Sequence, residues 1–188
     1  MRKLISFVHI SLDGFVAGPK GEMDWITINE EIFDYAGKLL KPIDSALYGR
    51  STFGMMENYW PTAADKPNAT KHDIEHSRWY EKVNKIILSK TLQGKKFPNS
   101  TIISSNVADE IKKLKQQNGS DIVIFGSPGA THSLIKEDLV DGYWLFVNPV
   151  ILGNGIPLFA EIKNRTQFKL VESKNFSSGV IALQFEKK

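Results

Sequence analysis

Three turns of this chain place small polar or basic residues at the ends of short apolar runs. They comprise Gly49, Arg50, Ser51 and Thr52; Ser89, Lys90 and Thr91; and Gly126, Ser127, Pro128 and Gly129. Cationic side chains bind phosphate through charge-assisted hydrogen bonds, and hydroxyl groups suit the same ligand. In open α/β sheets the carboxyl ends of the strands form the ligand crevice. Together the turns predict a long ligand that carries phosphate, whereas any one of them alone is equally explained as a solvated chain reversal.

The third turn follows the most informative strand. Ile122–Phe125 is a continuous apolar run, which is typical of a strand covered on both faces in a parallel sheet. A helix is predicted over residues 130–135, so backbone N–H groups at its start favour a bound phosphate. The glycines are also explained as residues that only allow a tight turn. The Gly126-x-x-Gly129 spacing is not a complete dinucleotide-binding motif, and no Gly-Lys-Ser/Thr phosphate loop follows it.

The remaining elements predict one α/β domain over residues 1–188. Strands are expected over residues 4–12, 45–48, 85–88, 101–104, 122–125 and 143–147, and helices after Asn29, from Phe53, over 71–83 and after Asn106, with both asparagines as N-caps. Residues 167–173 and 180–186 alternate around a Ser-Ser-Gly turn, which predicts an antiparallel hairpin. Residues 60–67 predict a polar surface loop and the most mobile segment of the chain.

The composition excludes several classes of function. The 188 residues are 41% apolar and 24% charged, as expected of a soluble globular protein, and the net charge of +3 with scattered basic residues does not predict nucleic-acid binding. The chain has no cysteine, which excludes disulfides, thiol catalysis and cysteine-bound zinc. No segment approaches about 20 apolar residues, so a cytoplasmic protein without a membrane span is expected.

The histidines give a weaker signal. His72 and His76 are spaced i, i+4 but do not complete a His-Glu-x-x-His motif, so a solvated helix face and no metal site are predicted. His132 starts the helix after the third turn, where it either contacts a ligand phosphate or is simply a polar helix start. His9, in the middle of the first strand, is interpreted as a core or cleft residue.

Taken together, the motifs resemble the dihydrofolate-reductase-like fold, and most closely its riboflavin-biosynthesis reductases, the RibD C-terminal domain family. The matching segments keep their order and span nearly the whole chain. They are residues 11–17 (SLDGFVA), 49–53 (GRSTF), 87–92 (ILSKTL), 124–128 (IFGSP), 139–141 (LVD) and 148–159 (NPVILGNGIPLF). The resemblance implies a three-layer α/β fold with a mostly parallel central sheet, an antiparallel C-terminal hairpin, NADPH binding and hydride transfer.

The resemblance also implies a role for each motif. Val16 and Ala17 would approach the nicotinamide, with the loop of residues 18–25 folding over it. The turn of residues 49–52 would hold the adenosine side of the cofactor, residues 88–90 the adenine and its 2′-phosphate, and residues 126–131 the pyrophosphate. Cationic and hydroxyl groups without a carboxylate agree with this reading, because they suit a 2′-phosphate and disfavour plain NAD.

Proton donation and substrate binding fall to the first forty residues. Dihydrofolate reductases place one carboxylate on the helix after the first loop, and Glu31 is the nearest match, with Glu30 one residue away. Glutamates in a first helical turn are also explained by the helix dipole. Asp13 is the second acidic candidate, although before Gly14 it equally braces a turn. Trp25, on the first loop, is the candidate for closing over a substrate.

The implied substrate is the pyrimidine ribosylamine phosphate of riboflavin synthesis, or another substrate if the chain is a paralogue. Reduction of a dihydropterin and a non-catalytic NADPH-binding module are the two alternatives. The Gly-Gly pair common in these reductases is Gly126-Ser127 here, and without cysteine the chain cannot carry the zinc deaminase of the bifunctional enzymes. The resemblance also implies a homodimer, because related reductases often pair. Trp144 and Phe146 would then lie in either the sheet core or the interface.

Overall fold

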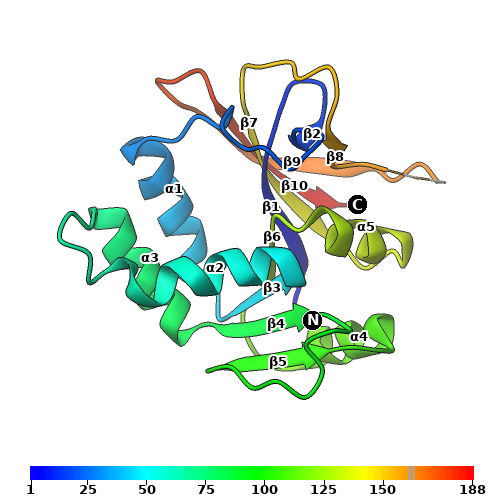
Figure 1. Ribbon diagram of the computed structural model, residues 1–188. Helices are drawn as coiled ribbons and strands as arrows, with labels where there is room; N and C mark the ends of the chain where they lie inside the picture. Colours follow the sequence, from blue (N-terminus) through cyan, green and yellow to red (C-terminus); the bar gives the residue numbers. More distant parts are fainter. Residues whose placement is uncertain (161, 163) are drawn as a thin grey trace. The chain divides into compact units, whose positions relative to one another are not determined.

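The computed structural model describes residues 1–160, 162 and 164–188 (Figure 1). Eight strands follow the hydrogen-bonded order β5-β4-β3-β6-β1-β7-β10-β9, and β2 pairs separately with β8. The predicted α/β class, with a mostly parallel sheet and an antiparallel C-terminal hairpin, is confirmed. The chain divides into two compact units, one of residues 1–2 and 29–123 and the other of residues 3–28 and 124–188.

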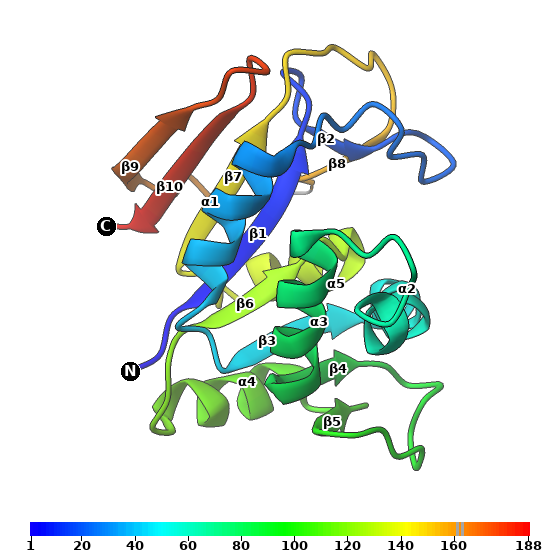
Figure 2. The same ribbon diagram turned by 90° about the vertical axis from the view of Figure 1, so that its left-hand side faces the viewer.

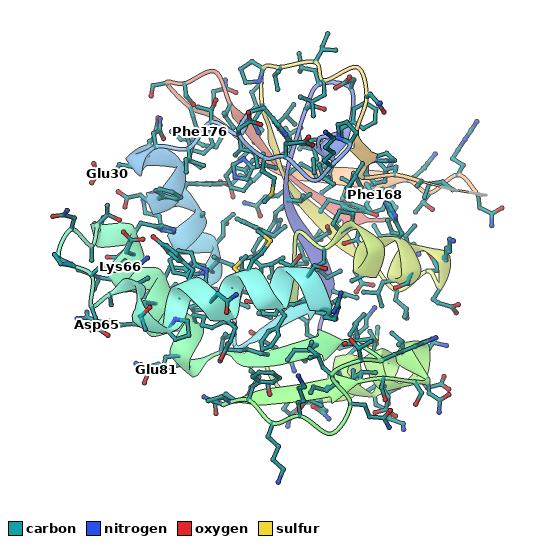
Figure 3. The ribbon with its side chains drawn as sticks, in the orientation of Figure 1. Glu30, Asp65, Lys66, Glu81, Phe168 and Phe176 are labelled. Carbon is teal, nitrogen blue, oxygen red and sulfur yellow. The ribbon has the colours of Figure 1, made fainter. Side chains whose placement is uncertain are left out.

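The first unit is built on three parallel strands. Strand β3 (Ser45–Gly49) pairs with β4 (Asn84–Leu88), which pairs with β5 (Ser100–Ile103). Its helices are α1 (Glu30–Leu40), α2 (Arg50–Ala63), α3 (Lys71–Lys82) and α4 (Val107–Gln116). Leu47, Tyr48 and Ile87 are fully buried in this unit, whereas Glu30, Asp65, Lys66 and Glu81 are exposed (Figure 3).

The second unit is built on β1 (Leu4–Ile10) and β7 (Gly142–Val147), which run parallel from Ile5↔Gly142 to Ile10↔Val147. The hairpin of β9 (Phe168–Asn175) and β10 (Ile181–Lys187) continues from β7 (Figure 2). Strand β2 (Phe15–Ala17) pairs with β8 (Ile156–Pro157), and helix α5 covers Pro128–Lys136. Strand β6 (Ile122–Phe125) is buried along its whole length, as its continuous apolar run predicted, and its residues are shared between the two units.

Rings fill much of the second unit. Phe146 is fully buried and stacks on Phe176, with ring centroids 6.1 Å apart, and Phe168 packs edge-on against Tyr143 at 5.2 Å (Figure 3 labels Phe176 and Phe168). Trp144, which lies two residues before Phe146, is only half-buried and contacts the ring of Phe7. The sequence left open whether Trp144 and Phe146 belong to the core or to an interface. Phe146 is a core residue, whereas Trp144 is partly exposed.

The predicted loop over residues 60–67 is wrong in its first half. Helix α2 begins at Arg50 and continues through Pro61 to Ala63, although proline disfavours a helix interior. Trp60 explains the extension, because its indole N–H donates to the Met56 sulfur at 3.0 Å and its carbonyl accepts from the Ser77 hydroxyl at 2.7 Å. Tertiary packing here outweighs the local effect of the proline.

One predicted helix cap is also wrong. Asn29 caps α1, since its side chain accepts a hydrogen bond from the backbone N–H of Ile32 at 2.9 Å. Asn106 occupies the equivalent position, directly before α4. Its backbone is left-handed (φ 48°, ψ 37°), and its side chain makes no capping hydrogen bond. Asparagine tolerates that conformation better than most residues, so the residue type suits the turn rather than the cap.

The contact of Gly155 with β2 gives a first prediction. A Cβ at Gly155 would lie 2.3 Å from the Ala17 carbonyl oxygen and 3.2 Å from the Phe15 ring. We expect Gly155→Ala to lower the free energy of unfolding by about 1–3 kcal/mol, as overpacking does. Gly37→Ala on α1 is the matched control, because its Cβ meets no atom within 4 Å and the change should raise stability by about 0.5–1 kcal/mol. Equal stabilities of the two variants in urea would contradict the prediction.

Candidate active site

Two of the three predicted turns are neighbours in the first unit. In the parallel register Gly49 lies opposite Leu88, so the turns that follow β3 and β4 leave the sheet at the same edge. Arg50 is the first residue of α2, whose first turn contains no acidic residue. Arg50 and Lys90 are exposed, and neither forms an ion pair with a carboxylate in the part of the chain that the structure describes. Two cations and a helix N-terminus at one edge suit a phosphate.

Ser89 stabilises the turn after β4 instead of presenting its side chain to solvent, as Lys90 does. Its side chain is almost buried, and its hydroxyl accepts the backbone N–H of Leu92 at 3.2 Å and lies 3.4 Å from the Thr91 hydroxyl. The hydroxyl therefore holds the turn that carries Lys90. Ser51, by contrast, is exposed on the first turn of α2, and Thr52 is half-buried beside it.

The structure separates the two candidate glutamates of α1. Glu30 and Glu31 both lie in the first turn after the Asn29 cap, where the helix dipole favours negative charge. Glu30 is exposed and points outward from α1 (Figure 3), whereas Glu31 is half-buried. Partial burial makes Glu31 the better placed of the two for contact with a ligand.

Asp13 braces a turn in the second unit. Its carboxylate accepts hydrogen bonds from the Ser11 hydroxyl at 2.6 Å and from the backbone N–H groups of Leu152 and Gly153 at 3.2 and 2.8 Å. The Ser11 bond is the main reason that the pKa of Asp13 lies below its ordinary value. These bonds tie the start of β2 to the segment before β8, and they favour the bracing role that the sequence left open.

Val16 and Ala17, the residues expected at the nicotinamide, are both buried on β2. Val16 lies within the antiparallel pairing of β2 with β8, where the register shifts between Phe15 and Ala17. Leu158 adds a hydrogen bond from its backbone N–H to the Gly14 carbonyl at 2.9 Å. The short two-stranded sheet therefore fixes the backbone of these two residues.

The third turn has an unusual backbone. Gly126 and Ser127 both have φ of 49°, in the left-handed region, and Pro128 then starts α5. Thr131 is fully buried and its hydroxyl donates to the Gly126 carbonyl at 3.2 Å, which closes the turn. Gly129 and Ala130 lie in the first turn of α5, where backbone N–H groups have no partner within the helix. Left-handed serine is strained, and such strain is concentrated at functional sites.

The loop that carries Trp25 is held by its own hydrogen bonds. Gly18 N–H donates to the Glu22 carbonyl at 2.9 Å, and the Trp25 indole N–H donates to the same carbonyl at 3.1 Å. Trp25 is half-buried. At the far end of the loop, the backbone N–H of Thr27 donates to the Asn148 side-chain oxygen at 2.9 Å.

Asn148 and His132 are residues whose bonds the sequence did not predict. Asn148 is fully buried and bonds to Thr27, Ile10 and Phe146. The His132 ring nitrogen Nε2 lies 2.9 and 3.1 Å from the carbonyl oxygens of Pro157 and Leu158, so this histidine ties α5 to β8. The sequence shows that Asn148 and Pro149 follow an apolar strand. It does not show which backbone groups form hydrogen bonds with the buried Asn148 amide.

His72 and His76 do not lie on a solvated helix face, and that prediction is wrong. His72 stacks on Phe33 with ring centroids 3.7 Å apart, and His76 lies 4.1 Å from Trp60 and 5.0 Å from Trp79. Burial lowers the pKa of His76 to about 3 and also lowers that of His72. In the described part of the chain no group of three histidines or carboxylates has the arrangement of a metal site.

A groove of about 480 Å³ lies beside this ring cluster, between α1 and α3. Lys38, Lys41, Arg78 and Trp79 are among its lining residues, and none of the predicted site residues is. The two strand-end turns of the same unit are not part of it. Over residues 1–160, 162 and 164–188, no helix is both long enough and apolar enough to span a membrane.

Known proteins give this arrangement a context. A family model described as the RibD C-terminal domain matches residues 2–182. The protein YyaP of Bacillus subtilis (strain 168), itself uncharacterised, is 34% identical over 98% of this chain and 94% of its own length. A Shewanella sp. PV-4 structure, named for riboflavin biosynthesis, has a TM-score of 0.73 at 20% identity over 99% of both chains. Dihydrofolate reductase from Enterococcus faecalis, complexed with NADP(H), has a TM-score of 0.63 at 16% identity over 99% of this chain and 96% of its own. The dihydrofolate-reductase-like fold is therefore confirmed.

Two partly buried histidines give a prediction for pH dependence. Burial lowers the pKa of His9 to about 4 and that of His76 to about 3, against 6.5 in an unfolded chain. Above pH 6.5 neither histidine affects stability. As the pH falls from 6.5 towards 4, the unfolded state binds protons first, and each histidine costs up to about 3 kcal/mol of unfolding free energy.

The measurement is urea unfolding at pH 7 and at pH 4.5. In His76→Phe the aromatic packing is largely kept and one titrating group is removed, so the loss of stability between the two pH values should shrink. A loss as large as that of the unchanged protein would contradict the assignment of this window to His76. The folded-state pKa values can be checked independently from the ring resonances.

Proposed function

Because this chain belongs to the RibD C-terminal domain family, we propose that it is an NADPH-dependent reductase. The observation that carries the proposal is the pairing of Gly49 with Leu88, which brings the turns bearing Arg50 and Lys90 to the same edge of the first unit. Two cations without a carboxylate partner among the described residues suit the 2′-phosphate that distinguishes NADPH from NADH. The NADP(H) complex of the structurally similar Enterococcus faecalis enzyme supports the same cofactor.

Each turn would contribute one part of the cofactor site. Residues 49–52 would hold the adenosine side, with Leu88, Ser89 and Lys90 at the adenine and 2′-phosphate. In the turn of residues 126–131 the N–H groups at the start of α5 would bind the pyrophosphate, because the helix dipole favours negative charge there. Val16 and Ala17, fixed by the β2–β8 pairing, would set the nicotinamide plane. The cofactor supplies the hydride, and the chain supplies orientation.

Glu31 is the residue that we propose to hold or deliver a proton to the substrate. It is half-buried in the first turn of α1, the position that the family resemblance gives to the substrate-binding carboxylate. Asp13 accepts three hydrogen bonds that brace the loop beside β2. General acid catalysis by a positioned carboxyl group typically contributes about 10²–10⁴-fold to a rate. Trp25 would close over the substrate ring from the loop of residues 18–25.

The substrate proposed first is 5-amino-6-(5-phosphoribosylamino)uracil, as the family implies. The likeness to the Shewanella sp. PV-4 structure, named for riboflavin biosynthesis, supports this choice. A dihydropterin is the alternative that the likeness to a dihydrofolate reductase supports. A further alternative is a module that binds NADPH without catalysis. A paralogue that reduces another substrate is also consistent with the uncharacterised relative YyaP.

We also propose that the protein is cytoplasmic and pairs as a homodimer. The observation in favour of pairing is strand β9, which ends the strand order and exposes Leu170 and Val171 to 54% and 51%. An edge strand with exposed apolar residues favours pairing with another chain. Light scattering of the purified protein measures this directly, and a monomer at micromolar concentration would contradict it.

The cofactor proposal predicts a selective effect of Lys90. NADPH at a hundredfold excess over Kd should stabilise the chain by about 2.7 kcal/mol, whereas Lys90→Gln should weaken NADPH binding roughly tenfold and leave NADH binding unchanged. Thermal unfolding with each nucleotide is the measurement. Lys112→Gln, an equally exposed lysine on α4, is the matched control and should change neither affinity. Absence of stabilisation by millimolar NADPH would rule out the cofactor proposal.

The catalytic proposal predicts oxidation of NADPH when 5-amino-6-(5-phosphoribosylamino)uracil is added. Glu31→Gln should reduce kcat at least about 100-fold with unchanged NADPH affinity, since the amide cannot give up a proton. Glu30→Gln is the neighbouring control and should have little effect. Turnover of dihydrofolate instead would establish the dihydropterin alternative. Saturable NADPH binding without oxidation by pyrimidines, pterins or carbonyl compounds would establish the non-catalytic module.

A further inference from the structure

Asn148 is the centre of a buried hydrogen-bond network at the end of β7. Its backbone N–H donates to the Ile10 carbonyl at 2.8 Å, which extends the β1–β7 pairing by one residue. Its side-chain nitrogen donates to the Phe146 carbonyl at 3.0 Å, approaches the Ile10 carbonyl at 3.5 Å and lies 3.2 Å from His9 Nδ1. The side-chain oxygen accepts the Thr27 N–H at 2.9 Å. The side chain is fully buried.

This set of partners requires an amide in one orientation. A backbone N–H needs an acceptor and backbone carbonyls need donors, so the oxygen of Asn148 must face Thr27 and its nitrogen must face Phe146. Aspartate has no donor for the carbonyls, and leucine has neither function. The network therefore specifies asparagine, and it connects three segments: β1, β7 and the end of the loop that carries Trp25.

The orientation of Asn148 also fixes the proton on His9. Because the amide nitrogen is a donor, His9 Nδ1 must accept, and the imidazole proton then lies on Nε2. The ring is stacked on Phe146, with centroids 4.9 Å apart and 24° between the planes, which limits its rotation. Burial lowers the pKa of His9 to about 4, so the ring is neutral near pH 7. No hydrogen bond joins Nε2 to another residue among those the structure describes.

The position of this pair is where a ligand is expected. His9 and Asn148 lie at the carboxyl ends of the parallel strands β1 and β7, the edge at which α/β sheets bind ligands. Thr27, on the same network, lies two residues after the loop of residues 18–25. A neutral N–H donor on a fixed ring is suited to an uncharged acceptor, such as the carbonyl oxygen of a heteroaromatic ring.

We propose that His9 is a specificity-determining residue that donates a hydrogen bond from Nε2 to a ring carbonyl of the substrate, and that Asn148 is the positioning residue that fixes its tautomer and anchors the substrate loop at Thr27. The inference deepens the proposed function and rests on it for the identity of the substrate. It does not depend on which of the two heterocycles is reduced, because uracils and pterins both carry ring carbonyls.

The test combines nuclear magnetic resonance and kinetics on the full chain. Ring ¹⁵N shifts should show His9 as the Nε2–H tautomer, and Asn148→Leu should convert it to a mixture. Titration with 5,6-diaminouracil and with folate, each with and without NADPH, should move the Nε2 resonance for at least one of the two. An Nδ1–H tautomer in the unchanged protein, or no movement with either probe, would overturn the inference.

Three variants separate function from stability. His9→Phe keeps the ring and its stacking but removes the donor, so it should raise KM or the probe Kd roughly 3- to 10-fold with unchanged NADPH affinity. His9→Gln, which restores an N–H donor, should recover part of the loss. His72→Phe is the matched control in the first unit and should leave KM unchanged. Unaltered KM and probe affinity in His9→Phe would overturn the inference even if Asn148→Leu fails to fold.

The outcomes also distinguish the two proposals. If NADPH does not bind but a probe still moves the His9 Nε2 resonance, the proposed reductase function fails and the ligand role of His9 stands. If NADPH binds and is oxidised while His9→Phe changes nothing, the reductase function stands and the role of His9 fails.

Discussion

The pairing of β1 with β7 is the interaction on which the second unit depends. Its register is fixed at the amino end by Asp141, whose backbone N–H donates to the Leu4 carbonyl at 2.8 Å and whose side chain accepts the Leu4 N–H at 2.7 Å. In the middle of the same strand the Phe7 carbonyl accepts the Gly126 N–H, and at its carboxyl end the Ile10 carbonyl accepts the Asn148 N–H. One strand therefore positions both the third turn and the amide that holds the Trp25 loop. A slip of one residue in its register would move every side chain of the strand to the opposite face of the sheet.

The first unit uses charge differently at its two edges. At the amino ends of its strands, the buried guanidinium of Arg2 pairs with Asp44, donates to the Ser120 carbonyl and reaches the Ser45 hydroxyl at 2.7 Å. Asp44 in turn accepts the Ser120 N–H at 3.0 Å. This cation is enclosed by acceptors, whereas Arg50 and Lys90 at the carboxyl ends are exposed. A buried charge without partners would be costly, so the enclosed pair is structural and the exposed cations are the ones suited to a ligand.

The sequence predicted those features that depend on local pattern. Continuous apolar runs gave the strands, and Asn29 gave the start of α1, because both signals act over a few residues. The failures have a common cause in distant contacts. Trp60 extends α2 through Pro61 through its hydrogen bonds with Met56 and Ser77. His76 packs against the rings of Trp60 and Trp79 instead of lying on a solvated face. Asn148 escaped prediction for the same reason, since its partners lie about 120 and 140 residues away in the chain.

The third turn has Ser127 where related reductases commonly have a second glycine, yet its backbone keeps the left-handed conformation. Gly126 and Ser127 are both left-handed, and only the first is a glycine, so the backbone path is retained at a cost of about 1–2 kcal/mol for an L-residue in that region. The buried Thr131 hydroxyl, bonded to the Gly126 carbonyl, offsets part of that cost by closing the turn. A turn that binds through backbone N–H groups depends on its conformation more than on its side chains. The departure at Ser127 therefore keeps the backbone N–H groups on which the proposed pyrophosphate contact depends.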